Sequence, residues 1–183
     1  MIGAAFGATL ARAQAGDEAA FACIFRDVQP ALLRYLRVIA PEAEDVAGDT
    51  WLQVVAGLAG FRGGEQAFRA WLFTIARHRA ADAGRSRARR PAVPLAGSGA
   101  AEQLVSPDAA DLALEAISAR AVVALVKELP PDQAEIIMLR VVAGLDVGEV
   151  ARIVGKTPGA VRVAAHRGLR RLASRVERAG VTQ

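Results

Sequence analysis

The stretch LDVGEVARIVGKTPGAVRVAAHRGLRRL, residues 145–172, decides the fold class because it holds two helix signals separated by a short turn. Asp146 followed by Glu149 is typical of an acidic capping box, and the glycine of the GKTP turn is typical of a helix end. Thr157 and Pro158 then predict a new helix, because the hydroxyl can cap its first turn and proline fits its first position. This spacing is that of a helix-turn-helix.

The second helix of this motif is predicted to have an apolar face and a basic face. At 100° per residue, a narrow apolar stripe would pack on the preceding helices: Val161, Ala165, Gly168, Leu172 and Val176. A recognition helix places the face opposite its apolar stripe in the major groove, where Arg, His and Val side chains contact base edges. An ordinary amphipathic surface helix is the alternative. We expect these DNA-binding residues on the basic face: Arg162, Val163, His166, Arg167, Arg170 and, toward the phosphates, Arg171.

Length and composition extend this expectation to the whole chain. The chain has 183 residues, of which 53% are hydrophobic and only 5% aromatic, a composition that favours helices over a β-sandwich or barrel. The length allows one medium domain or two small ones. We therefore predict an all-α fold of two small helical domains.

Apolar spacing and punctuation residues predict where these helices lie. Apolar residues recur every three or four positions from Asp17 to Ile39, and Pro30 must either start a second helix there or kink the first. Further helices are expected after Pro41, after the loop at residues 61–64, over residues 111–128 and from Pro131. Residues 91–108 are rich in Pro, Ala, Gly and Ser, which is a linker composition. The predicted division is a first domain at 1–91, a flexible linker at 92–110 and a second domain at 111–183.

The charges alternate along the chain. Residues 17–49 carry seven acids against three bases, whereas residues 77–91 carry six Arg against one acid. Residues 92–135 carry seven acids against two bases, and residues 152–183 carry eight bases against one acid. Two separate basic blocks indicate two anion-binding surfaces, one on each domain. Helix-dipole compensation by Arg-rich helix ends is the alternative for each block taken alone.

Other features argue against several classes of protein. The single cysteine, Cys23, cannot form an internal disulfide, and its apolar neighbours predict a buried thiol in a reducing compartment. No apolar run approaches the ~20 residues that span a bilayer, so we expect a cytoplasmic protein without membrane insertion. The two His and the cysteine are scattered and no phosphate-binding glycine loop is evident, so we expect no cofactor, no metal site and no enzymatic activity.

From Asp17 to Leu172 the chain resembles bacterial RNA polymerase sigma factors of the extracytoplasmic-function (ECF) group within the sigma-70 superfamily. DEAAFACIFRDVQPALLRYLR and AEDVAGDTWLQVV resemble region 2 of that family, and FRGGEQAFRAWLFTIARHRAADAGRSRARR resembles its minus-10 reader. LPPDQAEIIMLRVVAGLDVGEVARIVGKTPGAVRVAAHRGLRRL resembles region 4, which reads the minus-35 element. The resemblance implies a transcription initiation factor that assists promoter opening.

The resemblance also implies partners and site residues. The expected partners are promoter DNA and core polymerase, the latter through the clamp helices of its largest subunit and its flap. An anti-sigma factor is a further expected partner. The core-binding residues implied are Asp45, Asp49, Thr50 and Trp51. The minus-10 residues implied are Arg62, Gly63 and Gly64 in a loop, then His78, Asp82 and Arg85 on a helix. An autonomous helix-turn-helix repressor or activator is the alternative, but that interpretation gives no function to residues 43–76.

Overall fold

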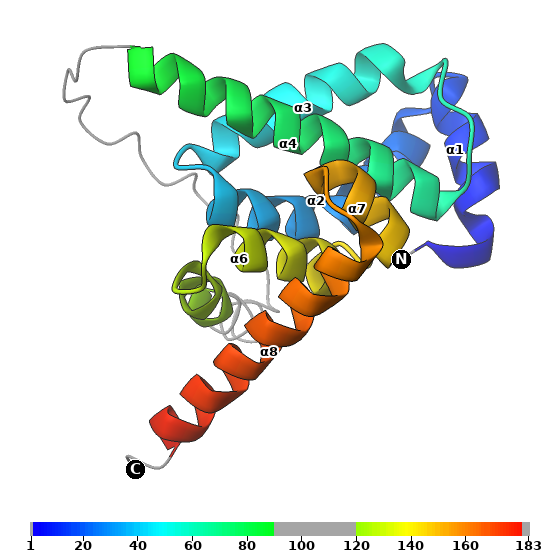
Figure 1. The fold of residues 1–183 in the computed structure, drawn as a ribbon. Helices are drawn as coiled ribbons and strands as arrows, with labels where there is room; N and C mark the ends of the chain where they lie inside the picture. The colour runs from blue at the N-terminus through cyan, green and yellow to red at the C-terminus, as the bar shows by residue number, and fades with distance from the viewer. Residues whose placement is uncertain (1, 90–119, 181–183) are drawn as a thin grey trace, which may run out of the picture.

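The structure is a computed structural model, and it describes residues 2–89 and 120–180. Within these residues every regular element is a helix, which confirms the predicted all-α class (Figure 1). The helices in chain order are η1 (Gly3–Ala5), α1 (Phe6–Gln14), α2 (Glu18–Ile39), α3 (Ala43–Leu58), α4 (Glu65–Arg89), an unlabelled helix at residues 120–127, α6 (Pro131–Ile137), the π-helical turn η2 (Met138–Val142), α7 (Val147–Val154) and α8 (Pro158–Gly180).

Helices α1, α3 and α4 pack around α2. This helix runs without interruption through Pro30, so no second helix starts there, which was one of the two alternatives expected at the proline. Val28 and Leu32, on either side of the proline, are both buried, and their packing supports the helix where the proline removes one main-chain donor. Cys23 on the same helix is exposed, which corrects the prediction of a buried thiol.

The second part of the chain contains the helix-turn-helix. Helix α6 begins at Pro131, as predicted, and η2 widens the last turn before α7. Helix α8 runs away from the rest of the molecule toward the C-terminus (Figure 1). The predicted linker at 92–110 and the first part of the predicted helix at 111–128 lie outside the described residues.

One apolar core joins the two parts. Buried residues of α2 and α4 belong to the same cluster as buried residues of α6, η2 and α7. Tyr35, Phe68 and Phe73 on the first side and Met138 and Leu139 on the second are all at most 1% exposed. The sequence did not predict this arrangement, in which the helix-turn-helix packs directly against the N-terminal bundle.

Candidate functional site

The helix-turn-helix is built as its local sequence signals require. Asp146 Oδ1 accepts a hydrogen bond from the Glu149 main-chain N–H at 2.7 Å, and Glu149 Oε2 accepts one from the Asp146 N–H at 3.1 Å. Gly155 ends α7 at φ 68°, in the left-handed region that glycine adopts without strain. The Thr157 hydroxyl then accepts from the Ala160 N–H at 3.2 Å. These caps fix the angle at which α8 leaves the turn.

The inner face of α8 packs closely on α6. Val161 is fully buried, and a Cβ added at Gly168 would lie 2.5 Å from Ile137 Cδ1. Ala165 and Leu172 are half-buried, whereas nothing is described of the Val176 side chain. Glycine at position 168 therefore allows the two helices to approach, and the predicted apolar stripe is the packed face.

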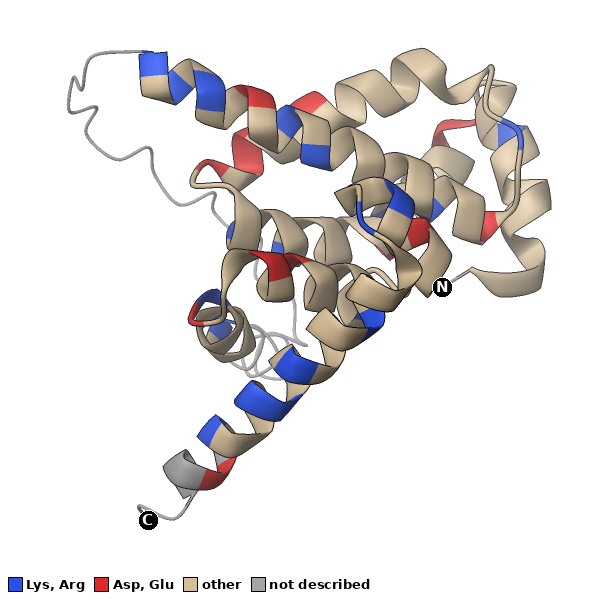
Figure 2. Cartoon of the chain, in the orientation of Figure 1, with Lys and Arg blue, Asp and Glu red and all other residues tan. Residues whose placement is uncertain are grey.

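The outer face of α8 is exposed and basic. Arg162, His166, Arg167 and Arg170 are exposed, and Val163 among them is 50% exposed. The Arg171 guanidinium donates to Gln133 Oε1 at 3.1 Å, so it lies at the edge of this face beside α6. Figure 2 shows the Lys and Arg residues along α8. The structure thus brings together the six residues expected to bind the minus-35 element.

The six residues expected to bind the minus-10 element form two separate groups. Arg62, Gly63 and Gly64 lie in the loop before α4, and the Arg62 guanidinium donates to the carbonyls of Ala59 and Phe61 at 2.9 and 2.7 Å. His78, Asp82 and Arg85 are exposed on the second half of α4, where Asp82 and Arg85 form an ion pair. With ~1.5 Å of rise per residue, the 14 residues from position 64 to 78 separate the groups by about 20 Å.

The aromatic residues of this segment pack on one another. The rings of Phe61 and Trp71 are stacked with centroids 5.0 Å apart, and Phe68, which is fully buried, contacts both. Because Phe68 is buried, it is unavailable in this arrangement for stacking on unpaired bases. Trp71 and Phe61 are half-buried.

Helix α3 separates the expected core-binding residues into exposed and buried pairs. Asp45 and Asp49 are exposed, as expected of contact residues. Thr50 is fully buried and its hydroxyl donates to the Val46 carbonyl at 2.7 Å. Trp51 is 7% exposed, and its Nε1 donates to Gln29 Oε1 at 2.6 Å. The expectation that the Thr50 and Trp51 side chains line a surface is therefore wrong, because both point into the bundle.

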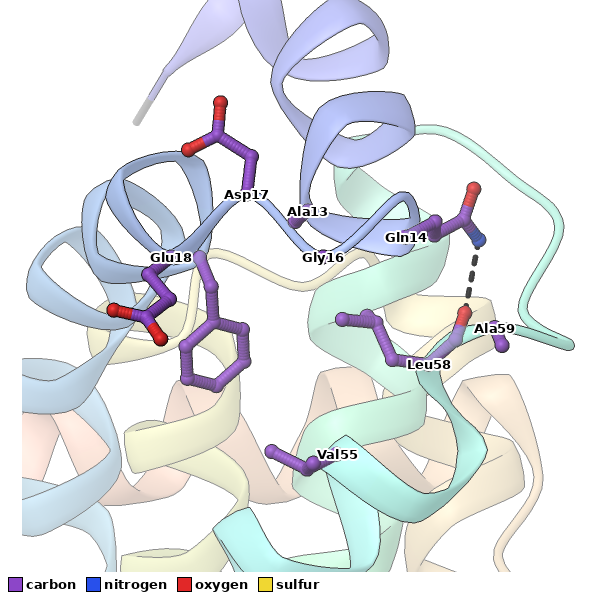
Figure 3. A pocket seen from close by; sticks show the side chains of 9 residues that line it. Ala13, Gln14, Gly16, Asp17, Glu18, Val55, Leu58 and Ala59 are labelled. Carbon is purple, nitrogen blue, oxygen red and sulfur yellow. Dashed lines mark hydrogen bonds between the residues drawn. The ribbon is translucent and has the colours of Figure 1, made fainter.

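Two exposed apolar residues on α3 were not predicted from the sequence. Leu52 is 72% exposed and Val55 is 55% exposed, and at 100° per residue they share a face with Asp45 and Asp49. Val55 also lines a pocket of about 300 Å³ between the start of α2 and the end of α3 (Figure 3). The available signal was helical phase, since both residues fall off the buried stripe that Trp51 belongs to.

The described residues show no group of three or more potential metal ligands. No helix in the described part of the chain is both long and apolar enough to cross a membrane.

Comparison with known proteins shows which family the chain belongs to. The chain is 38% identical to the ECF RNA polymerase sigma factor SigD of Mycobacterium tuberculosis over 98% of its own length and 88% of that protein. The chain belongs to the ECF sigma factors. The Sigma-70 region 2 family matches residues 24–90 and the Sigma-70 region 4 family matches residues 119–172. In this sigma factor, the region 2 match covers α3, α4 and most of α2, and the region 4 match covers α6, α7 and most of α8.

Other relatives agree with this assignment. The sigma factor is 36% identical to BldN of Streptomyces coelicolor over 88% of its length and 62% of that protein. CnrH, solved in complex with the cytosolic domain of CnrY, matches with a TM-score of 0.61 and 25% identity over 94% of this chain and 97% of that one. RpoE of Bartonella quintana, solved with the anti-sigma factor NepR, matches with a TM-score of 0.60 and 26% identity over 86% and 96%.

Proposed function

We propose that this sigma factor binds core RNA polymerase, directs it to promoters that carry two sequence elements, and assists strand opening. The observation that carries the proposal is the exposed basic face of α8 within a capped helix-turn-helix, in a chain whose region 2 is also present. The phosphodiester chemistry belongs to the polymerase, so the sigma factor acts without catalysis of its own. Because promoters and polymerase are cytoplasmic in bacteria, we place its action there.

Region 4 is proposed to read the minus-35 element with α8. Arg162, Val163, His166 and Arg167 occupy the first half of the helix, which is the half that a recognition helix inserts most deeply into the major groove. Arg side chains there can form paired hydrogen bonds with guanine O6 and N7. Arg170 and Arg171 follow one turn later and are better placed for phosphates, and the flap of the polymerase is the proposed protein partner of region 4.

Region 2 is proposed to hold the minus-10 element along α4. The loop residues Arg62 to Gly64 and the helical residues His78, Asp82 and Arg85 stand about 20 Å apart, so one separated strand would have to follow the helix to reach both groups. The basic end of α4 supplies charge for the phosphates (Figure 2).

The α3 face is proposed to bind the clamp helices of the largest polymerase subunit. We define the α3 face as Asp45, Asp49, Leu52 and Val55, all of them exposed. Its apolar pair would be buried on binding and its carboxylates would meet basic groups of the partner. Thr50 and Trp51 pack in the bundle on the buried side of α3 and so hold this face in place.

The domain boundaries remain those proposed from the sequence, at 1–91, 92–110 and 111–183. A tether of that length keeps the second domain near its promoter element once the first is bound, which raises its effective concentration. An anti-sigma factor is a proposed further partner, because solved relatives occur in complex with CnrY and with NepR, the latter itself an anti-sigma factor. Failure to capture any such partner from unstressed cells would count against that last proposal.

Promoter-complex assembly tests the proposed function. Labelled promoter DNA is mixed with the sigma factor, with core polymerase, and with both, and strand opening is followed by permanganate reactivity. A heparin-resistant, open complex only when both proteins are present is the expected result. Tight sequence-specific duplex binding by the chain alone, without polymerase association, would instead support the autonomous regulator.

A further inference from the structure

The loop between α3 and α4 is held by the last residue of α1. This loop, residues 59–64, carries half of the residues proposed to bind the minus-10 element. Gln14 ends α1, and its Nε2 donates to the carbonyl oxygens of Leu58 and Phe61, both at 2.9 Å (the first is drawn in Figure 3). Leu58 is the last residue of α3, where main-chain carbonyls lack partners within the helix. One amide with two N–H donors therefore joins the end of α3 to the middle of the loop.

The other end of the loop is held by the first residue of α4. The Glu65 carboxylate accepts from the Ile2 N–H at 3.0 Å through Oε1 and from the Gly3 N–H at 2.8 Å through Oε2. Hydrogen bonds to an ionised acceptor are stronger than those between neutral groups. Residues 2–14, which we call the N-terminal brace, thus contact both ends of the loop.

Aromatic packing links the N-terminal brace to the middle of the loop. Phe6 at the start of α1 is 3% exposed, and its ring centroid lies 5.6 Å from that of Phe68 on α4. Phe68 in turn contacts Phe61 of the loop, with centroids 5.6 Å apart. Gly63 has a φ of 149°, and a Cβ added there would lie 2.9 Å from Ala67 Cβ and 3.2 Å from the Phe61 ring. The brace, the start of α4 and the loop therefore form one packed unit.

The composition of the loop makes such support necessary. Three of its six residues are glycine, and glycine loses more conformational freedom on folding than any other residue. Arg62 is exposed, and its guanidinium donates to the Phe61 carbonyl at 2.7 Å. Because the same carbonyl accepts from Gln14, the position of Arg62 depends on where Gln14 holds the loop.

We propose that the N-terminal brace fixes the loop in the conformation that receives the unpaired minus-10 strand, and that Gln14 and Glu65 are positioning residues that act through the loop. The proposal rests on the proposed function, because the conformation of the loop affects transcription only if DNA binds there. The Sigma-70 region 2 match begins at residue 24, so the brace lies outside the matched segment. A loop that populates many conformations binds with an affinity lowered by its competent fraction. Release of the loop should therefore weaken recognition of the minus-10 element alone.

The test compares four variants of the full chain. The two loop-releasing variants are Gln14→Leu, which removes both donors at similar side-chain size, and Glu65→Ala, which frees the other end and remains informative if the first folds poorly. The rescue variant is Gln14→Lys, which restores a donor of similar reach. The matched control is Thr9→Val, since the Thr9 hydroxyl donates to the Ala5 carbonyl at 3.0 Å, inside the brace and away from the loop. Thermal melts establish that each variant is folded.

The first readout is hydrogen exchange of the loop amides. The Gly60 and Phe61 N–H groups both donate to main-chain carbonyls at 3.1 Å, so both are protected in the native chain. Exchange at these amides should be about tenfold faster in each loop-releasing variant, because each loses two hydrogen bonds that hold the loop. The rates should return toward the native values in the rescue variant and stay native in the control.

The second readout separates the two promoter elements. A promoter recovered by run-off transcription with the native chain is compared with single-base changes in either of its motifs, with core polymerase in excess. The loop-releasing variants should lose about tenfold in discrimination among minus-10 changes and keep native discrimination among minus-35 changes, and the rescue variant should restore the loss. A general loss of stability would lower both alike, so the split between the elements marks a positioning role.

Three results would overturn the brace. One is native exchange at the loop in both loop-releasing variants, another is faster exchange with unchanged minus-10 discrimination, and the third is an equal loss at both elements. All three leave the proposed function intact if the native chain yields start sites with two motifs. A native chain that yields no such start sites refutes the proposed function and the minus-10 role of the brace with it, even where exchange shows that the brace holds the loop.

Discussion

Leu52 and Trp51 are neighbours on α3, and the structure gives them opposite environments. Leu52 is 72% exposed, so folding buries only about a quarter of its surface. Complete burial of a leucine side chain stabilises by ~1.5 to 3 kcal/mol, so Leu52→Ala should change the free energy of unfolding by at most about 0.8 kcal/mol. The remaining surface would become buried if the α3 face binds core polymerase as proposed. The same substitution should therefore cost about 1.5 kcal/mol of binding, a roughly tenfold weaker Kd.

The assay combines urea unfolding with competition for core polymerase against a labelled native chain. Trp51→Ala is the matched comparison, because Trp51 is buried between Phe21 and Phe25 and its Nε1 donates to Gln29. It should lose about 3 to 5 kcal/mol of stability. Unchanged polymerase affinity in Leu52→Ala, or a stability loss as large as that of Trp51→Ala, would refute the assignment of the α3 face.

Three further predictions concern other parts of the chain. Arg162→Ala should cost about 1 to 3 kcal/mol of discrimination among minus-35 sequences, whereas Arg175→Ala should weaken binding evenly; equal losses on all promoters for both would contradict the face assignment. Asp146→Ala should lower the free energy of unfolding by about 1 kcal/mol because it removes half of the capping box, which a thermal melt will test. The Ala20 N–H, and next the Arg12 guanidinium, hold the pKa of Asp17 below 3.8, so its stabilisation is complete above that pH and is lost as the pH falls further; Asp17→Asn should melt with less dependence on pH below about 4.

Much of the fold follows from local signals in the sequence. The helix-turn-helix was predictable because each of its devices acts within a few residues: the capping box, the glycine at the end of α7 and the Thr157 cap. The outer face of α8 followed from helical phase alone. The family, which the resemblance indicated, is confirmed by relatives that match nearly the full chain.

Other parts could not be predicted from local signals. Thr50 and Trp51 were placed on a surface by their position in a family motif, whereas helical phase groups Trp51 with the buried Val54 and Leu58. The contacts of Arg69 and Arg77 with region 4 join residues 74 and 58 positions apart, and no short-range pattern specifies such pairs. The packing of region 4 on region 2 therefore emerged only from the three-dimensional structure.

Run-off transcription tests the central claim most directly. Core polymerase transcribes a pool of genomic promoter fragments with and without the sigma factor, and the 5′ ends of the products are sequenced. The account predicts new start sites that share two spaced motifs, and it predicts their loss when Leu52→Ala or Arg162→Ala is used at limiting concentration. No new start sites, together with tight duplex binding by the chain alone, would contradict it.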